Sequence, residues 1–421
     1  MPKFLHIADI HLGFDHYDNR DRTKDFYRAL EDVLLKYAVR EPVDFVIIAG
    51  DLFEHRTIQP AILNQAKTCL MYLQEAGIPV IAIEGNHDNR PYGTVTNWLK
   101  YLADDSLLIL LEPEAIDGQV RYEPWDADYR SGGYIDLPCG VRVVGSQWYG
   151  SSAPKMIQTL ADAIAALPSH PGQTIMLLHH GLEGQIARYQ GALRYNDLLP
   201  LQQAGVDYLA LGHIHKSYVE QGWIFNPGSL EANSVEESTY DRGALLVEFI
   251  DQQIKWELKQ DYYQRQIIRL KLKTKGNELV DELQNAAIAL VENAIQTTKI
   301  QVEHQPIVEL RIEGTVGFDR LDLDTRRLQQ ELQQLTGALI FLLRYNVESL
   351  TFESPIAPDA NRSHIEQEVF LDCLTAHNSY KNRANLLSQG LIELKDKCLQ
   401  GDPEEALYDF VQELLAQELL A

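Results

Sequence analysis

Short runs of β-branched and other apolar residues recur through the first part of the chain, and each stops abruptly at a glycine or a polar side chain. The first three are residues 4–8, 45–49 and 79–83. Such runs are typical of buried strands, and apolar residues at helical spacing between them indicate crossover helices. Parallel strands joined by helices predict an α/β fold. Further runs of the same kind are residues 141–145, 174–178, 206–211 and 244–250.

The character of the sequence changes after residue 262. Apolar and charged residues alternate around Ile268 and Leu310, as in half-exposed strands, and helical stripes run through residues 279–291 and 325–335. We therefore expect residues 1–262 to form the α/β domain and residues 263–353 a small α+β domain. After a stretch with proline and aspartate at residues 354–359, the remainder of residues 354–421 is predicted to be helical.

Composition limits the class of protein. The 421 residues are 45% hydrophobic and 23% charged, as in soluble globular proteins. The formal net charge of −24 argues against a protein that coats nucleic acid through its overall field, but local phosphate binding aided by metal ions is compatible with it. The four cysteines form no Cys-x-x-Cys pair, so neither a disulfide framework nor a thiolate zinc site is indicated. No membrane-spanning run and no signal-peptide layout occur, so we expect a cytoplasmic protein.

Side chains that bind metals follow five of the strand-like runs. They are Asp9 and His11, Asp51, Asn86 and His87, His179, and His213 with His215. Side chains two positions apart on an extended chain point the same way, and parallel strands end at one edge of their sheet. We therefore expect a parallel sheet to bring all five strand ends together. Imidazole, amide and carboxylate donors without thiolate suit Mn²⁺, Fe or Zn²⁺, Mn²⁺ best, and they suffice for two ions sharing one carboxylate. Histidines outside this pattern, such as His6 and His16, are predicted to be ordinary core or surface residues.

These five motifs resemble those of the calcineurin-type metallophosphoesterase superfamily. They are Asp9-Ile10-His11, Gly50-Asp51-Leu52-Phe53, Gly85-Asn86-His87-Asp88, Leu178-His179-His180-Gly181 and Gly212-His213-Ile214-His215. Within the superfamily, Gly-Asp-Leu-Phe, Asn226-Pro227-Gly228-Ser229-Leu230-Glu231 and the appended α+β domain resemble the SbcD-type nuclease subunits of bacterial double-strand-break repair. The resemblance implies a β-sandwich flanked by helices, a small α+β cap domain and a helical C-terminal segment that docks a partner.

The resemblance also implies a role for each site residue. One divalent ion would be held by Asp9, His11 and His215, and a second by Asn86, His179 and His213, with Asp51 bridging the two. His87 would be the catalytic residue that contacts the scissile phosphate. Many archaeal and eukaryotic relatives carry histidine three residues after the bridging aspartate, where this chain has Glu54. That departure leaves metal binding intact but puts the fine detail of DNA cleavage in question.

Three functions of different classes fit these features. The resemblance implies a Mn²⁺-dependent DNA exonuclease or endonuclease of a repair complex, which works with an SbcC-like coiled-coil ATPase and admits a homodimer. A small-molecule or cyclic-nucleotide phosphodiesterase or phosphatase would need the same core alone, although a substrate-selecting cap could occupy the rest of the chain. A scaffold with a vestigial site is disfavoured by the complete ligand set. Residues 264–421 favour the nuclease.

Two segments predict contacts with partners, each with an alternative. Arg269, Lys271 and Lys273 alternate along one strand face and could follow a phosphate backbone, or could form a solvated outer face. Residues 403–421 contain no lysine or arginine. Their helical apolar stripe could pack on the protein's own core or dock on the ATPase. The stripe consists of Leu407, Phe410, Val411, Leu414, Leu415 and Leu419.

Overall fold

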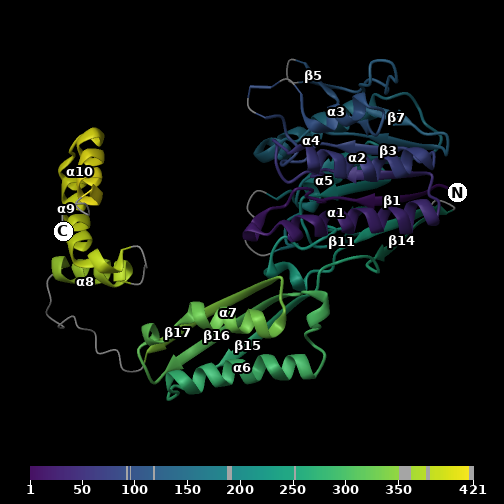
Figure 1. The fold of residues 1–421 in the computed structure, drawn as a ribbon. Helices are drawn as coiled ribbons and strands as arrows, with labels where there is room; N and C mark the ends of the chain where they lie inside the picture. Colours follow the sequence, from purple (N-terminus) through teal and green to yellow (C-terminus); the bar gives the residue numbers. More distant parts are fainter. Residues whose placement is uncertain are drawn as a thin grey trace. The chain divides into compact units, whose positions relative to one another are not determined.

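The computed structural model describes residues 1–91, 93–94, 96–116, 119–186, 192–250, 253–349, 362–375 and 380–416. The chain divides into two compact units (Figure 1). The first comprises residues 1–269, 301–309 and 337–340, and the second comprises residues 270–300, 310–336 and 341–421. The predicted division at residues 262 and 353 stays a prediction, because its second boundary falls outside the described residues.

Two six-stranded sheets form the first unit. One runs in the order β14 (Gln253–Lys259), β13 (Ala244–Ile250), β1 (Lys3–Ile7), β2 (Phe45–Ala49), β3 (Val80–Ile83) and β4 (Ile109–Leu110). The other runs in the order β11 (Tyr218–Glu220), β12 (Ile224–Asn226), β10 (Tyr208–Gly212), β9 (Gln173–His179), β8 (Val141–Val144) and β7 (Tyr134–Asp136). A separate two-stranded sheet pairs β5 (Glu114–Ile116) with β6 (Gln119–Arg121).

Most strands of both six-stranded sheets pair in parallel, and antiparallel strands lie at one edge of the first sheet and at both edges of the second. β1 to β4 pair in parallel, as do β8, β9, β10 and β12. β13, β14, β7 and β11 pair antiparallel. The predicted α/β class is therefore confirmed. The expectation of one sheet was wrong, because β1, β2 and β3 lie in one sheet while β9 and β10 lie in the other.

Apolar side chains fill the space between the sheets and the space under the helices. Between the sheets, the rings of Phe4 and Phe45 stack at 4.9 Å and those of Tyr208 and Phe225 at 4.1 Å. Helices α1 (Arg20–Leu34), α2 (Pro60–Glu75) and α3 (Trp98–Asp104) cover the outer face of the first sheet. Helices α4 (Ala153–Ala165) and α5 (Tyr195–Gln203) cover the second. Fully apolar strands are expected where both faces of a sheet are covered in this way.

The C-terminal part contains a three-stranded sheet and five longer helices among its described residues. The sheet runs in the order β15 (Ile267–Lys273), β16 (Ile307–Val316) and β17 (Ile340–Ser349). The helices are α6 (Val280–Gln296), α7 (Thr325–Thr336), α8 (Arg362–Thr375), α9 (Ala384–Gln400) and α10 (Glu404–Ala416). Within the described ranges, no helix has both the length and the apolar composition that a membrane crossing needs.

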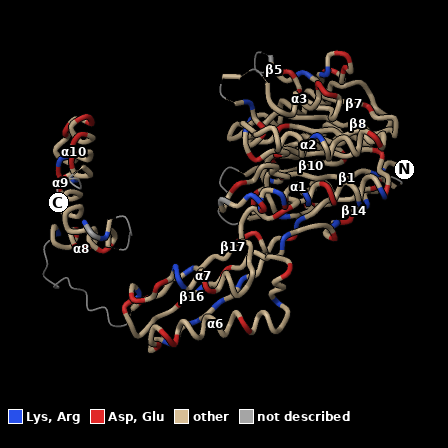
Figure 2. The backbone as a smooth tube through the Cα atoms, viewed as in Figure 1, with Lys and Arg blue, Asp and Glu red and all other residues tan. Residues whose placement is uncertain are grey.

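The basic face of β15 is paired with acidic side chains. Arg269 Nε lies 2.8 Å from Glu309 Oε2, and the Lys271 ammonium contacts the Glu313 carboxylate. Charges of both signs alternate along this part of the chain (Figure 2). Because β16 supplies the opposite charges, this strand face is not the open cationic track that DNA binding would require. The solvated outer face is the interpretation that the structure favours.

Candidate metal centre

The predicted ligands stand on turns at which the strands end, and the backbone there is unusual. Asp9, His11, Asp51 and His213 have φ angles of 52°, 53°, 53° and 84°, a left-handed conformation that is uncommon outside glycine. The turns after β1 and β2 hold one another, since the Ile10 N–H donates to the Asp51 carbonyl at 2.8 Å. Such backbone persists only where its surroundings over-determine it, and it clusters at functional sites.

Two glycines allow the ligands to approach one another closely. A Cβ on Gly50 would lie 2.3 Å from Nδ1 of His179, and a Cβ on Gly85 would lie 2.1 Å from Oδ1 of Asp51. Both distances are far below van der Waals contact, so any larger residue would displace the imidazole or the carboxylate. The glycines that precede Asp51 and Asn86 in the sequence motifs are therefore needed for the geometry of the site.

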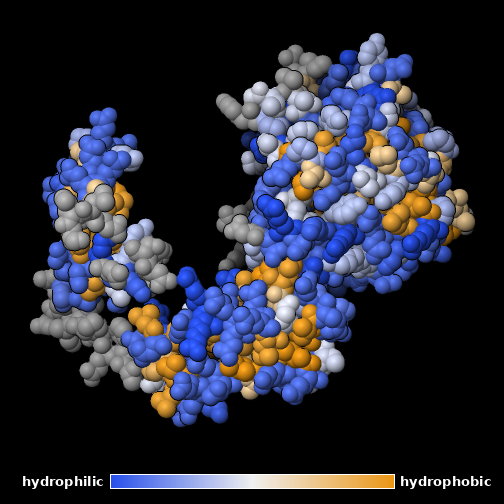
Figure 3. All heavy atoms as spheres, in the orientation of Figure 1, coloured by the Kyte–Doolittle hydropathy of each residue, from blue (hydrophilic) through white to orange (hydrophobic). Residues whose placement is uncertain are grey.

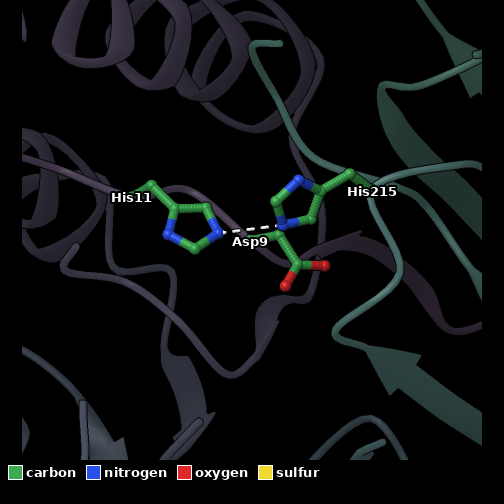
Figure 4. A group of neighbouring side chains, drawn as sticks. All are labelled: Asp9, His11 and His215. Atoms are coloured by element: carbon green, nitrogen blue, oxygen red, sulfur yellow. Dashed lines mark hydrogen bonds between the residues drawn. The ribbon is translucent and has the colours of Figure 1, made fainter. Parts of the chain in front are cut away.

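Asp9, His11 and His215 form the first group of donors (Figure 4). One ligand atom from each residue lies within 4.8 Å of the other two. The Nε2 atoms of His11 and His215 face each other at 3.1 Å. Both carboxylate oxygens of Asp9 accept the backbone N–H of His213 at 2.9 Å, which orients that carboxylate. Two imidazole nitrogens and a carboxylate thus converge on one small volume, as metal ligands do.

Carboxylates behind the two rings determine which nitrogen faces the group. Oε2 of Glu54 lies 2.8 Å from Nδ1 of His11, and Oε1 of Glu237 lies 3.0 Å from Nδ1 of His215. Burial opposes the charged ring of His215, but Glu237 raises its pKa to about 9. Burial likewise opposes ionisation of Glu54 and Glu237, yet the paired histidines hold the pKa of each carboxyl below its ordinary value. A proton on Nδ1 leaves Nε2 available to a metal ion.

Asp51, His179 and His213 form the second group, with Asn86 beside them. Nε2 of His179 lies 3.1 Å from both Asp51 Oδ2 and Asn86 Oδ1, and Nδ1 of His213 lies 2.8 Å from Asn86 Oδ1. Nδ1 of His179 donates to the Ala49 carbonyl at 2.8 Å, so its Nε2 faces the group. Burial opposes the charged ring, but Asp51 raises the pKa of His179 to about 9. Without metal, a proton on Nε2 therefore takes the place that a cation would occupy.

Charged side chains of both groups affect the pKa of Asp51. Burial works against its ionisation, but His179, followed by His11 and His87, holds its pKa well below the usual range. Its Oδ1 also accepts the His87 N–H at 2.8 Å. These contacts support a carboxylate shared between two cations, although the bridging role itself stays a prediction.

His87 and Asp88 complete the turn after β3 in different ways. Nδ1 of His87 lies 2.6 Å from the Glu54 carbonyl oxygen, so this nitrogen carries a proton and donates it, and Nε2 is the nitrogen left for a substrate. The Asp88 carboxylate accepts the N–H groups of Leu52 and Phe53 at 2.9 Å each. Burial and then the Asp51 charge raise the pKa of Asp88 to about 7. Asp88 therefore shapes the turn.

The donor set fits divalent cations. Nitrogen and oxygen donors without sulfur are the set that Mn²⁺, Fe and Zn²⁺ accept, and two separate groups of three suit two ions. All eight predicted site residues are described, and the structure brings them together at facing strand ends of the two sheets. Their individual roles as ligands or as the catalytic residue stay predictions.

The structure adds two acidic residues that the motifs do not identify as contacts of the site. Glu54 stands where some relatives carry histidine, and it lies in a third group with His11 and His87. Its position three residues after Asp51 is the sequence signal that could have revealed it. Glu237 lies in a short 3₁₀ turn, Val235–Thr239, and is distant in sequence from His215. No pattern in the sequence marks it.

Comparisons with known proteins show the family to which the chain belongs. The model of the family described as calcineurin-like phosphoesterase matches residues 2–217. The DNA double-strand break repair protein Mre11 of Archaeoglobus fulgidus is 30% identical over 254 residues, which are 56% of this chain and 52% of that protein. The protein of the same name from Saccharolobus solfataricus is 25% identical over 402 residues, 92% of this chain and 94% of that protein.

A third relative has a name that carries less information. The uncharacterized metallophosphoesterase YhaO of Bacillus subtilis is 25% identical over 428 residues, 94% of this chain and 95% of that protein. The chain thus spans about half the length of the Archaeoglobus relative and nearly all of the Saccharolobus and Bacillus relatives. The two long alignments extend well beyond the region matched by the family model.

Proposed function

The chain belongs to the calcineurin-like phosphoesterase family, and on that premise we propose that it is a Mn²⁺-dependent phosphodiesterase that cuts DNA. The observation that carries the proposal is the convergence of two donor groups, Asp9 with His11 and His215 and Asp51 with His179 and His213. A site of this kind is expected in a phosphoester hydrolase, because two neighbouring cations can bind one phosphate between them.

In the proposed mechanism the chain's own residues hold the reacting groups. Asp9, His11 and His215 would bind one ion, Asn86, His179 and His213 the other, and Asp51 both. When bound, the ions supply an activated water and neutralise the charge that develops on the phosphate. Glu237 keeps the Nδ1 proton of His215 in place, and Glu54 lies beside Nδ1 of His11, so that Nε2 of each ring points to the site.

His87 would act on the phosphate itself. Because its Nδ1 donates to the Glu54 carbonyl, Nε2 is the atom able to approach a phosphate oxygen. When Nε2 is protonated, it can donate to the leaving oxygen or to an equatorial phosphate oxygen in the transition state. The side chain is 36% exposed, so a substrate can reach it. The products would be a phosphate monoester and an alcohol.

Support for DNA as the substrate comes from the relatives. The Saccharolobus protein, named for DNA double-strand break repair, aligns with this chain over 402 residues and not over the phosphoesterase region alone. A small-molecule or cyclic-nucleotide phosphodiesterase is the second candidate, because the metal centre alone would serve it equally well. The uncharacterized Bacillus relative, which aligns over a similar length, favours neither.

Digestion of end-labelled duplex DNA with Mn²⁺ tests the proposal, with a cyclic nucleotide as the competing substrate. We expect DNA cleavage that requires Mn²⁺, is lost with a chelator and is absent in the variant Asp51→Asn. Hydrolysis of the cyclic nucleotide with no attack on DNA would support the second candidate instead. The same assay with Mg²⁺, Fe²⁺ and Zn²⁺ would show whether Mn²⁺ is the preferred ion.

The C-terminal helices support a proposed partner, an SbcC-like ATPase. None of the described side chains of α8 is buried, and few are buried in α9 and α10. Several large apolar side chains of these helices are exposed, and Figure 3 shows orange, apolar surface in this part of the chain. They are Ile365, Val369, Leu386, Leu399, Tyr408 and Leu415. Apolar surface on helices with so small a core is expected to be covered by another protein.

The apolar stripe of α10 was predicted either to pack on the protein's own core or to dock on a partner, and its residues differ in burial. Leu414 is buried, and its side chain fills the space beside Gly390 of α9, where a Cβ would lie 2.4 Å away. Phe410 lies under the Lys397 ammonium at 5.3 Å. Leu415 is exposed, and Leu419 lies outside the described residues. The stripe thus packs partly on α9, and its exposed part is what the proposed docking would use.

Truncation at Gly401 tests the docking role. We expect the shortened chain to hydrolyse a small phosphodiester as the full chain does, and to lose association with the ATPase in a pull-down. Loss of hydrolysis or of cooperative unfolding would instead show that α10 belongs to the folded core. The substitution Leu415→Glu, at an exposed position, is a milder variant that should weaken association without disturbing the contact between α9 and α10.

A further inference from the structure

An aromatic side chain outside all the metal-binding motifs borders the second donor group. Trp148 follows β8, and its ring centroid lies 5.3 Å from that of His213 and 5.6 Å from that of His179. It also stacks on His180 at 5.9 Å with an interplanar angle of 26°. One large ring therefore lies beside both imidazoles of this group.

The position of Trp148 is fixed by its own contacts. Its backbone N–H donates to Oε1 of Glu84 at 3.3 Å, and the other oxygen of that carboxylate accepts from Asn97 at 3.2 Å. Just before it, the Gly145 carbonyl accepts the Tyr122 hydroxyl at 2.9 Å. These contacts fix the backbone that carries the ring, and the ring itself packs against three imidazoles; a binding surface requires such prior positioning.

The indole N–H of Trp148 and part of its ring are not engaged by the described residues. Buried tryptophans ordinarily satisfy their indole N–H. The buried Trp223 and the partly buried Trp98 both do so, by donating to backbone carbonyls at 2.7 and 3.1 Å. Within the described residues, the Trp148 indole N–H donates to no group, and the side chain is only partly buried. The exposed part of the ring and a hydrogen-bond donor therefore remain available at the edge of the site.

We propose that Trp148 stacks on the nucleobase next to the scissile phosphate, which makes the substrate a nucleotidyl diester. The inference rests on the proposed phosphodiesterase function and deepens it. The net charge of −24 weakens long-range attraction of a polyanion, whereas aromatic stacking does not depend on the protein's charge and accepts every base. A stacking surface beside the phosphate site gives this acidic chain a way to hold DNA locally.

A pair of chromogenic esters tests the proposal in the full-length protein. Thymidine 5′-(4-nitrophenyl phosphate) carries a base, and methyl 4-nitrophenyl phosphate has the same leaving group without one. For Trp148→Ala we expect kcat/KM to fall about tenfold to a hundredfold on the thymidine ester and to change less than about twofold on the methyl ester. Trp148→Phe, which retains a ring and guards against misfolding, should lose less. Equal losses on both esters, or weaker Mn²⁺ binding, would show that Trp148 only supports His179 and His213.

A binding measurement separates this inference from the proposed function. Thymidine 5′-monophosphate with Ca²⁺ should quench tryptophan fluorescence in the wild type and in Trp256→Phe, whose side chain lies exposed on β14. The quenching should disappear in Trp148→Phe. Equal quenching in all three proteins would overturn the stacking role even if DNA is cleaved. Quenching that depends on Trp148 without DNA cleavage would uphold stacking and refute the nuclease.

Discussion

Two sets of buried charged side chains lie in the first unit, and they differ in how completely the protein neutralises them. One is the metal centre. The other, here called the ion-pair network, consists of Arg22, Asp25, Glu231 and Arg265, and it contains two positive and two negative groups. The ion-pair network and the site residues Asp9, His11, Asp51 and His179 are buried, where an unpaired charge is very costly.

In the ion-pair network each carboxylate has donors on both oxygens. Asp25 accepts from Arg22 at 3.1 Å through Oδ2, and from Arg265 at 2.7 Å and the Tyr263 hydroxyl at 2.6 Å through Oδ1. Glu231 accepts the Arg265 N–H at 2.8 Å through Oε2, while its Oε1 lies 3.3 Å from Arg22. Charges of opposite sign are matched, so this set is complete without any ligand.

The metal centre is arranged in the opposite way. Nε2 of His11 and Nε2 of His215 face each other at 3.1 Å, although both are candidate metal ligands, and Asp9 and His11 adopt left-handed backbone. Such an arrangement gains stability only when a cation enters it. The comparison suggests a criterion: buried charges that only match one another are structural, whereas several imidazole nitrogens and carboxylate oxygens directed at one small volume are a site.

The largest expected effect comes from removing the charge of Asp51, the carboxylate that the two donor groups are proposed to share. Asp51→Asn should lower the rate of phosphodiester hydrolysis by about a thousandfold or more, which corresponds to ~4 kcal/mol of activation free energy. Mn²⁺ should raise the melting temperature of the wild type, because it binds the folded state, and should have little effect on the variant. Calorimetry with and without Mn²⁺ provides the measurement. A variant with normal metal content and a near-normal rate would contradict the shared-carboxylate assignment.

The matching substitution in the ion-pair network should affect stability instead. Asp25→Asn leaves Arg22 and Arg265 without their shared counter-charge, so we expect the free energy of unfolding to fall by about 3–5 kcal/mol. The control is Asp21→Asn on the same helix, an exposed partner of Lys24, which should have little effect. Mn²⁺ affinity of the folded variant should be unchanged. If Asp25→Asn lost metal binding but kept its stability, the distinction between the two sets would fail.

A smaller effect is expected from the carboxylate behind His215. Glu237→Gln keeps a side chain of the same size but removes the charge that holds the Nδ1 proton, so Mn²⁺ affinity should fall about tenfold to a hundredfold. Isothermal titration calorimetry gives the affinity directly, with Glu236→Gln, the exposed neighbour, as control. Stability of the metal-free protein should change less than in Asp25→Asn. An unchanged affinity would remove Glu237 from the metal centre.

The fold could be predicted from the sequence where local patterns suffice. Apolar runs ending in glycine or polar residues predicted β1, β2, β3, β9, β10 and β13, because buried strands need apolar side chains on both faces. Which strands share a sheet could not be read in this way, since a buried strand has the same composition in either sheet. β14 was not predicted, because its residues, such as Lys255 and Trp256, are largely exposed and give no apolar run.

The same distinction between local and long-range patterns applies to the residues of the site. Its predicted ligands occur in short motifs after strands, so local sequence identifies them. Glu237 and Trp148 reach the site from distant turns, and the ion-pair network joins α1 to Glu231 and Arg265 across more than two hundred positions. Long-range pairing leaves no local pattern. The basic strand around Lys271 was ambiguous for this reason, since the opposing Glu313 lies on another strand.

The last prediction concerns a buried group that belongs to neither set. His6 is fully buried on β1, where Nε2 donates to the Leu211 carbonyl at 3.1 Å and Nδ1 accepts the Tyr208 hydroxyl at 2.9 Å. Burial lowers its pKa from 6.5 to about 3. Below pH 6.5 the unfolded chain therefore binds a proton that the folded protein excludes, and stability falls as the pH decreases toward 3. At pH 5 this one group should lower the free energy of unfolding by roughly 2 kcal/mol relative to pH 7.

The variant His6→Gln, which cannot titrate, should not lose this stability, whereas the exposed His304→Gln should behave as the wild type. Urea unfolding of the metal-free proteins at both pH values gives the difference. Parallel losses in wild type and His6→Gln would mean that His6 is protonated in the folded state, and that a third buried charge must be added to the comparison.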